Sequence, residues 1–307
     1  MTLFYHGITE RRKHRTGIRI VTVLLCMAAV LATGCGRQQR SSGKMLVAAS
    51  IAPMANFAKH VGGDLVEVEL LVPPGSDPHT YQIEPAQMET LSSASVLVLN
   101  GAGLEFWADS AIDAANNSRL IVVRTADGLR ILDHAEADGG RGNPHVWVDP
   151  IDAIHQIGRI RDAFIKADPK HAADYKANAD QYTTQLKKLD SEIRSQVRQF
   201  KSKSFVSFHP TWVYFARRYG LIEAATIEES PGKEPTPEII NHAIKVAKRL
   251  NAKAVFTEPQ ASPKAAQVVA EEVGAKVLLL DAFGKPPDYD YIATMRSNVQ
   301  TMAEALQ

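Results

Sequence analysis

Short apolar runs alternate with amphipathic stretches along most of this chain. Several of the runs are apolar at nearly every position and rich in Val, Leu and Ile. Strands of this kind are typical of parallel sheets that are covered on both faces. The pattern therefore predicts an α/β fold. The predicted strands span 45–50, 66–72, 95–100, 120–123, 204–208, 221–227, 252–257 and 276–280.

Helical patterns fill the intervals between these strands. In the first half of the chain they lie at about 53–61, 85–93 and 104–116. In the second half, helices are predicted to begin near Thr211, Pro237 and Ser262, and a last one spans about 288–306. Thr, Ser and Pro are residues that helix N-termini prefer. Because the same alternation occurs twice, we predict two doubly wound parallel-sheet lobes of similar design.

One amphipathic segment between the lobes is different. From Tyr175 to Phe200 apolar residues recur every three or four positions, and neither Gly nor Pro occurs between 171 and 200. At 1.5 Å per residue this predicts a helix about 45 Å long that joins the two lobes. Such a rigid connector favours smaller hinge motions than paired strands would allow. The predicted parts are a first lobe at 45–168, a linking helix at 169–201 and a second lobe at 202–307.

The first 34 residues have the pattern of an export signal. Five basic residues precede an apolar run at 20–32, which is too short for an ordinary membrane span. The run ends in Leu31-Ala-Thr-Gly-Cys35, which resembles a bacterial lipobox, although Ala32 stands where a larger aliphatic residue is preferred. The alternative is an ordinary cleaved signal followed by an incidental cysteine. The predicted parts are a lipoprotein signal peptide at 1–34, a lipidated Cys35 and a polar tether at 35–44.

Composition excludes several classes of protein. The chain is 45% hydrophobic and 22% charged, as in ordinary globular proteins, which excludes a disordered chain. A net charge of +1 provides no excess of positive charge for nucleic acid, so we expect no such partner. Two cysteines cannot form a disulfide framework.

Three of the ten histidines share a local context. Each is next to a proline and lies between an apolar segment and a new structural element, where parallel α/β lobes bind ligands. They occur as Ser76-Asp-Pro-His79, Asn143-Pro-His145 and Phe208-His209-Pro. A fourth candidate, Asp281, directly follows the last predicted strand.

Three imidazoles and one carboxylate can complete a tetrahedral shell around a divalent ion between the lobes. For each residue alone, a structural role stays open: a histidine near a strand end often caps or packs, and Asp281 could simply form a turn. His134, in an acidic glycine-rich loop, and Glu258 are candidates for accessory contacts, and for His134 a plain surface loop is the competing interpretation. The histidines expected on solvated helix faces, without a ligand role, are His60, His155, His171 and His242.

Six segments, in order and with matching spacing, resemble the solute-binding lipoproteins of zinc- and manganese-type bacterial ABC importers. They are 50–54, 72–81, 100–107, 143–150, 208–216 and 256–260, and the resemblance covers 44–307. It implies two α/β lobes joined by a long helix, with a metal held between them by His79, His145, His209 and Asp281. It also implies an ABC permease and its ATPase as partners. We expect a monomer, lipid-anchored to the outer face of a bacterial membrane, that is not an enzyme.

The expected cargo is Zn²⁺, because three imidazoles and one carboxylate suit zinc better than manganese. Mn²⁺ remains the alternative, since the long His-rich loop of many zinc-type relatives is reduced here to 133–142. Two remoter alternatives are a zinc-dependent hydrolase and a surface adhesin. The first lacks a His-Glu-x-x-His motif, and no sequence feature supports the second.

Overall fold

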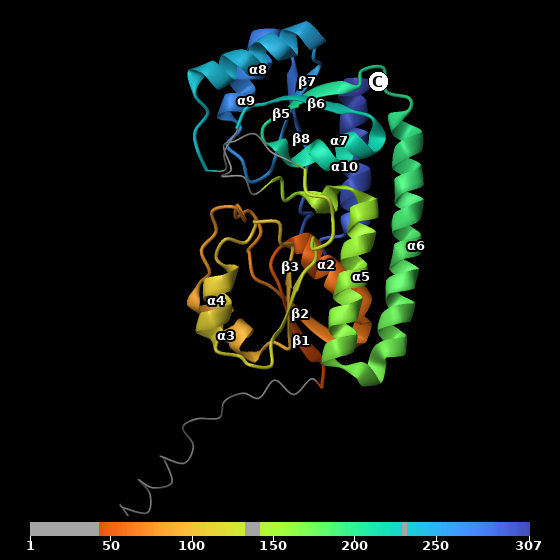
Figure 1. Ribbon diagram of the computed structural model, residues 1–307. Helices are drawn as coiled ribbons and strands as arrows, with labels where there is room; N and C mark the ends of the chain where they lie inside the picture. The colour runs from red at the N-terminus through yellow and green to blue at the C-terminus, as the bar shows by residue number, and fades with distance from the viewer. Residues whose placement is uncertain (1–42, 133–141, 229–231) are drawn as a thin grey trace, which may run out of the picture. The chain divides into compact units, whose positions relative to one another are not determined.

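The computed structural model describes residues 43–132, 142–228 and 232–307 (Figure 1). Residues 44–307 belong to one unit that contains two four-stranded sheets, and every strand pair in both sheets is parallel. The prediction of two parallel-sheet α/β lobes is thereby confirmed.

The sheet of the first lobe has the strand order β2-β1-β3-β4. All four residues of β3 are buried, as a central parallel strand with helices on both faces requires. The chain returns to each parallel neighbour through a helix or a long loop. The elements are β1 (Met45–Ala49), α2 (Ala52–Gly62), β2 (Val66–Leu70), α3 (Pro85–Ser93), β3 (Val96–Leu99), α4 (Ala108–Ala115) and β4 (Ile121–Arg124).

The sheet of the second lobe repeats this topology as β6-β5-β7-β8. Its central strand β7 is also buried at all four positions. Each of the four strands is followed in the sequence by one helix, α7, α8, α9 or α10 (Figure 1). The elements are β5 (Ser204–Ser207), α7 (Val213–Tyr219), β6 (Ile222–Thr226), α8 (Pro237–Leu250), β7 (Ala254–Thr257), α9 (Lys264–Val273), β8 (Lys276–Leu279) and α10 (Tyr291–Leu306).

Two long helices lie between the sheets in the sequence. α5 (Pro150–Ala167) begins behind Asp149, whose side chain accepts a hydrogen bond from the backbone N–H of Ile151. α6 (Ala172–Val197) has 26 residues and is therefore about 39 Å long. It packs against α2 and α5 and also against α7 and α10, so it joins the two lobes as predicted (Figure 1).

Apolar packing connects α6 to both lobes. One hydrophobic core runs from the first sheet through the buried face of α6 to α7 and α10, and a second core lies between the second sheet and the helices α8 and α9. The buried face of α6 carries the predicted apolar series, listed from its first turn to its last: Tyr175, Ala179, Tyr182, Leu186, Leu189, Ile193 and Val197.

Two helix starts illustrate where the boundaries differ from the predicted ones. The helix expected from 104 begins only at Ala108, because the residues before it form turns in which the Glu105 carboxylate accepts hydrogen bonds from the backbone N–H groups of Asn100 and Gly101. The last helix begins at Tyr291 because Asp290 caps the backbone N–H of Ala293. In the described ranges, every helix is too short or too polar to cross a membrane.

Candidate metal site

The three proline-flanked histidines follow the carboxyl ends of three different strands. His79 lies in the loop after β2, and His209 comes two residues after the end of β5. His145 lies beyond β4, directly before the short 3₁₀ helix Val146–Val148. The carboxyl edges of parallel sheets are where α/β lobes place ligands. The topology therefore brings together residues that are 66 and 64 positions apart in the sequence.

The three imidazoles converge on one point. Each offers a ring nitrogen, and these ligand atoms all lie within 4.8 Å of one another. The ring centroids are 5.0 Å apart for His79 and His145 and 5.1 Å apart for each of these with His209. The Nε2 atoms of His79 and His145 are 3.1 Å apart. Nitrogens from three residues at such spacing can bind a single divalent ion.

The site lies in a cavity of about 250 Å³ that both lobes line. His145 is 2% exposed and His209 is 6% exposed, while His79 is half-buried. In the described part of the chain Nε2 of His209 has no hydrogen-bond partner, and Nδ1 has only the Glu228 carboxylate at ion-pair distance. Buried polar atoms without a partner are rare because leaving them unsatisfied costs about 1–3 kcal/mol. The His209 ring is therefore arranged to bind a ligand that this cavity can admit.

His145 is held in one orientation by Asn143. The Asn143 side-chain oxygen accepts hydrogen bonds of 2.9 Å from both the backbone N–H and the ring Nδ1 of His145. The amide group of Asn143 cannot be turned over, because its Nδ2 donates to the carbonyl of Pro210 at 2.6 Å. Nδ1 of His145 must then carry the proton, which leaves the Nε2 lone pair available to a metal.

Buried carboxyl groups surround His209. Burial lowers the pKa of its imidazole, but the neighbouring Glu228, Glu258 and Glu223 raise it by more, so the net shift is upward from 6.5. Burial in turn raises the pKa of Glu223 to about 8. Burial also raises the pKa of Glu258, although the charge of His209 opposes that shift. Burial thus favours the neutral form of these carboxyl groups, and a cation bound at His209 would favour their ionised form.

Glu258, predicted as an accessory residue, lines the same cavity. Its carboxylate accepts hydrogen bonds from the Thr211 hydroxyl and, at 2.6 Å, from Gln260 Nε2. Glu258 is thus placed close to the imidazoles but is already bonded to its own lobe. His134 lies outside the described residues.

Asp281, predicted as the fourth ligand, lies away from the three converging nitrogens. It lines a neighbouring cavity of about 190 Å³. Its Oδ1 accepts hydrogen bonds from the backbone N–H groups of Phe283 and Gly284, at 2.8 and 2.9 Å. Among the described residues, the group whose ligand atoms converge comprises only the three histidines. A metal-binding role for Asp281 therefore stays a prediction.

The remaining histidines have other surroundings. His60 stacks on Tyr182, His155 contacts the carbonyl of Asp127 at 2.8 Å, and His171 pairs with a nearby carboxylate. His242 is exposed on α8. None of the four belongs to the converging group found among the described residues.

Two residues that lie beside the buried imidazoles were not singled out from the sequence. Asn143 belongs to the predicted Asn143-Pro-His145 segment, but the sequence does not indicate that its side chain holds the His145 ring. Glu228 lies close to the ring of His209, with its Oε2 3.2 Å from Nδ1. It carries no local signal, because its position depends on the pairing of β6 with β5.

The family model described as "Zinc-uptake complex component A periplasmic" matches residues 47–305. The chain is 26% identical over 303 residues to the zinc-binding lipoprotein AdcA of Streptococcus pneumoniae (strain ATCC BAA-255 / R6), covering 93% of this chain and 60% of that protein. It is 26% identical over 308 residues to the high-affinity zinc uptake system protein ZnuA of Bacillus subtilis (strain 168), covering 94% and 97%.

Among solved structures, a crystal structure of ZnuA aligns with a TM-score of 0.79 and 33% sequence identity, covering 85% of this chain and 99% of that one. This chain therefore spans nearly all of the solved ZnuA chain but about 60% of the length of the streptococcal lipoprotein.

Proposed function

We propose that this chain, which belongs to the family of periplasmic component A proteins of zinc-uptake complexes, captures Zn²⁺ outside the cytoplasm and delivers it to an ABC permease. The observation that carries this proposal is the convergence of three imidazoles, one of which is buried without any hydrogen bond to its ring nitrogens. The family is defined by an uptake component and not by an enzymatic activity.

The donor set supports zinc in preference to manganese. Three imidazole nitrogens suit a borderline ion, whereas Mn²⁺ prefers carboxylate, carbonyl and water oxygens and binds most weakly in the Irving–Williams order. The carboxyl groups around His209 do not reverse this preference for zinc. Both oxygens of the Glu258 carboxylate, for example, already accept hydrogen bonds, from Thr211 and Gln260. A fourth ligand, from Asp281 or from water, would complete a tetrahedral zinc shell.

Capture outside the cytoplasm fits the export pattern of the first 34 residues. We include lipidation of Cys35 in the proposal, with a tether at 35–44 that holds a monomer at the outer face of a bacterial membrane. The permease and its cytoplasmic ATPase would supply the energy for import. Cys35 and most of the tether lie outside the described residues.

The test is metal analysis of the chain purified from its own host, followed by competition between Zn²⁺ and Mn²⁺. We expect one zinc ion per chain and displacement of Mn²⁺ by equimolar Zn²⁺. Stable occupancy by Mn²⁺ in the presence of Zn²⁺ would assign the chain to manganese uptake. Failure to bind either ion stoichiometrically would contradict a role in metal capture. An esterase and peptidase assay of the zinc-loaded chain tests the hydrolase alternative, and we expect no turnover.

A further inference from the structure

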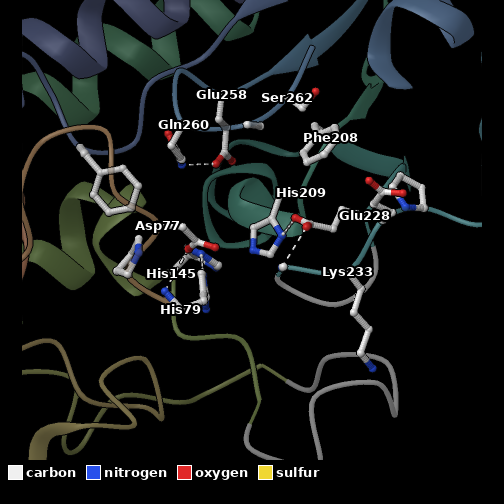
Figure 2. Close-up of a pocket in the computed structure, with 16 residues that line it drawn as sticks. Asp77, His79, His145, Phe208, His209, Glu228, Lys233, Glu258, Gln260 and Ser262 are labelled. Carbon is white, nitrogen blue, oxygen red and sulfur yellow. Dashed lines mark hydrogen bonds and ion pairs between the residues drawn. The ribbon is translucent and has the colours of Figure 1, made fainter. Parts of the chain in front are cut away.

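A carboxylate lies behind one of the three imidazoles, on the side away from the other two. Oε2 of Glu228 is 3.2 Å from Nδ1 of His209. The two side chains are 15% and 8% exposed, so this contact is largely shielded from water. Figure 2 shows His209 between Glu228 on one side and His145 and His79 on the other.

The backbone fixes Glu228 at this place. Beyond the last residue pair of β5 and β6, the ladder continues, because the N–H of Ile227 donates to the carbonyls of Ser207 and Phe208. The N–H of Glu228 also donates to the carbonyl of Phe208, at 2.6 Å. Phe208 directly precedes His209, so the two side chains leave adjacent backbone positions at the same sheet edge.

The other oxygen of Glu228 is also in use. Oε1 accepts a hydrogen bond of 3.1 Å from the backbone N–H of Gly232, as the second dashed line at Glu228 in Figure 2 indicates. The carboxylate is therefore oriented, with Oε2 directed at the imidazole. Glu258, the other carboxylate of the cavity, already accepts hydrogen bonds from Thr211 and Gln260.

On the basis of the proposed function, we propose that Glu228 is a positioning residue for zinc: it keeps the proton of His209 on Nδ1 and so presents the Nε2 lone pair to the ion. Nδ1 and Oε2 are within ion-pair distance but are not aligned as a hydrogen bond, and a small rotation of the ring would align them. Metal-ligating imidazoles commonly donate their second N–H to a carboxylate, which makes them stronger ligands.

The two buried imidazoles are thus oriented by different groups. His145 has a neutral amide behind it, from Asn143, whereas His209 has an anion. This difference matters for a divalent cation held by three neutral rings, because a buried charge without compensation is costly. Glu228 places a negative charge one imidazole away from the ion without occupying a coordination position. The second lobe would therefore supply both a ligand and part of the neutralising charge.

The test uses the full chain with three substitutions. E228A removes the carboxylate, E228Q keeps its size but removes its charge, and E234Q removes the charge of another acid that lines the same cavity. Zinc affinity is measured by competition with a chelator. We expect E228A to weaken binding by about 10- to 100-fold and E228Q to fall between E228A and the unchanged chain. The zinc affinity of E234Q should stay within about twofold of that of the unchanged chain, because this substitution removes only a solvated charge at the cavity edge.

A second readout separates positioning from general structural damage. The ¹⁵N chemical shifts of the His209 ring in zinc-free protein report which nitrogen is protonated, and they do not depend on metal transport. We expect the Nδ1–H form in the unchanged chain and a shift toward the Nε2–H form in E228A. The proposal is overturned if E228A and E228Q bind zinc as E234Q does, or if the tautomer is the same in all four proteins. If E228A fails to fold, the zinc affinity and the His209 tautomer of E228Q decide the matter. Absence of zinc binding in the unchanged chain would instead reject the proposed function of zinc capture.

Discussion

The segment that carries His145 and the loop that carries His79 both belong to the first lobe, but they are held in different ways. Local hydrogen bonds help to shape the His79 loop: Asp77 Oδ1 accepts from the N–H of His79, and the N–H of Thr80 donates to the carbonyl of Asp77. The His145 segment is instead bonded across to the second lobe at several points.

These cross-lobe bonds involve both main chain and side chains. Asn143 Nδ2 donates to the carbonyl of Pro210, and the hydroxyl of Tyr214 donates to the carbonyl of Asn143. Trp147 Nε1 donates to the carbonyl of Ala282, and the hydroxyl of Tyr291 donates to the carbonyl of Trp147. Arg218 binds both carboxylate oxygens of Asp149 through its Nε.

The His145 segment, although it belongs to the first lobe in the sequence, is thus held at the site by hydrogen bonds to the second lobe. The segment that carries His145 is bonded through Asn143 to the carbonyl of Pro210, which directly follows His209, so the two buried imidazoles should move together. We therefore expect zinc to be released by separating the His79 loop from this pair. The stiff α6 connector, which favours small motions, is consistent with such a local change.

The largest expected effect is that of pH on zinc affinity. His209, with its raised pKa, should take up a proton above pH 6.5, before an imidazole with an ordinary pKa does. Because a protonated ring cannot bind zinc, affinity should begin to fall while the pH is still above 6.5, and below the pKa of a competing imidazole it should fall by about tenfold per pH unit. Competition titrations from pH 8 to pH 5, corrected for the chelator, measure this. An affinity that stays constant down to pH 6 would contradict the assigned environment of His209.

The next effect concerns the cross-lobe bonds. Arg218→Ala leaves the carboxylate of Asp149, whose side chain is 6% exposed, without its partner. Breaking a buried ion pair in this way costs about 3–5 kcal/mol of unfolding free energy, and partial exposure of Arg218 places the expected loss near the lower figure. Denaturant unfolding measures it. Arg159→Ala, which breaks an exposed pair with Asp127, is the control and should cost less than about 1 kcal/mol. Equal losses of unfolding free energy in the two variants would contradict a stabilising role for the ion pair between Arg218 and Asp149.

Hydrogen exchange compares the two segments directly. In zinc-free protein, the amides of 76–81 should exchange faster than those of 143–149, because the latter segment is fastened to the second lobe. Zinc should slow exchange at 76–81 by about tenfold or more, and at 143–149 by much less. Mass spectrometry of peptides from both segments provides the measurement. The opposite ranking would show that His145, and not His79, is the ligand that moves.

The smallest expected effect is that of Asp281→Asn. If Asp281 becomes the fourth ligand when zinc binds, loss of its charge should lower affinity by about tenfold, the lower end for a ligand or its supporting group. Asparagine keeps an oxygen for the backbone N–H groups of Phe283 and Gly284, so the turn should persist. Chelator competition decides the matter, with unfolding as the check on the turn. Unchanged affinity would leave Asp281 as a turn former.

Much of the fold could be predicted because its signals are local. The continuous apolar runs located all eight strands to within about two residues, and the apolar series from Tyr175 identified α6. α5 was not delimited, although Asp149 and Pro150 form an ordinary helix start. The helix starts at Ala108 and Tyr291 depend on the turns that precede the first and on the Asp290 cap of the second, which apolar spacing does not encode.

The candidate site was only partly accessible from the sequence. Proline-flanked histidines at strand ends could be found because parallel strands gather their carboxyl ends at one edge. Asn143 and Glu228 act through contacts that depend on how the lobes and strands pair, so no local pattern identifies their roles. The placement of Asp281 beside a neighbouring cavity is likewise a matter of tertiary geometry.

The most direct test is zinc titration of His79→Ala, His145→Ala and His209→Ala, with the exposed His242→Ala as control. We predict that each of the three removes stoichiometric binding, with affinity lower by about 100-fold or more, because each takes one nitrogen from a three-nitrogen site. His242→Ala should bind one zinc ion with unchanged affinity. Full zinc binding by any of the first three variants would contradict the claim that these imidazoles form the site.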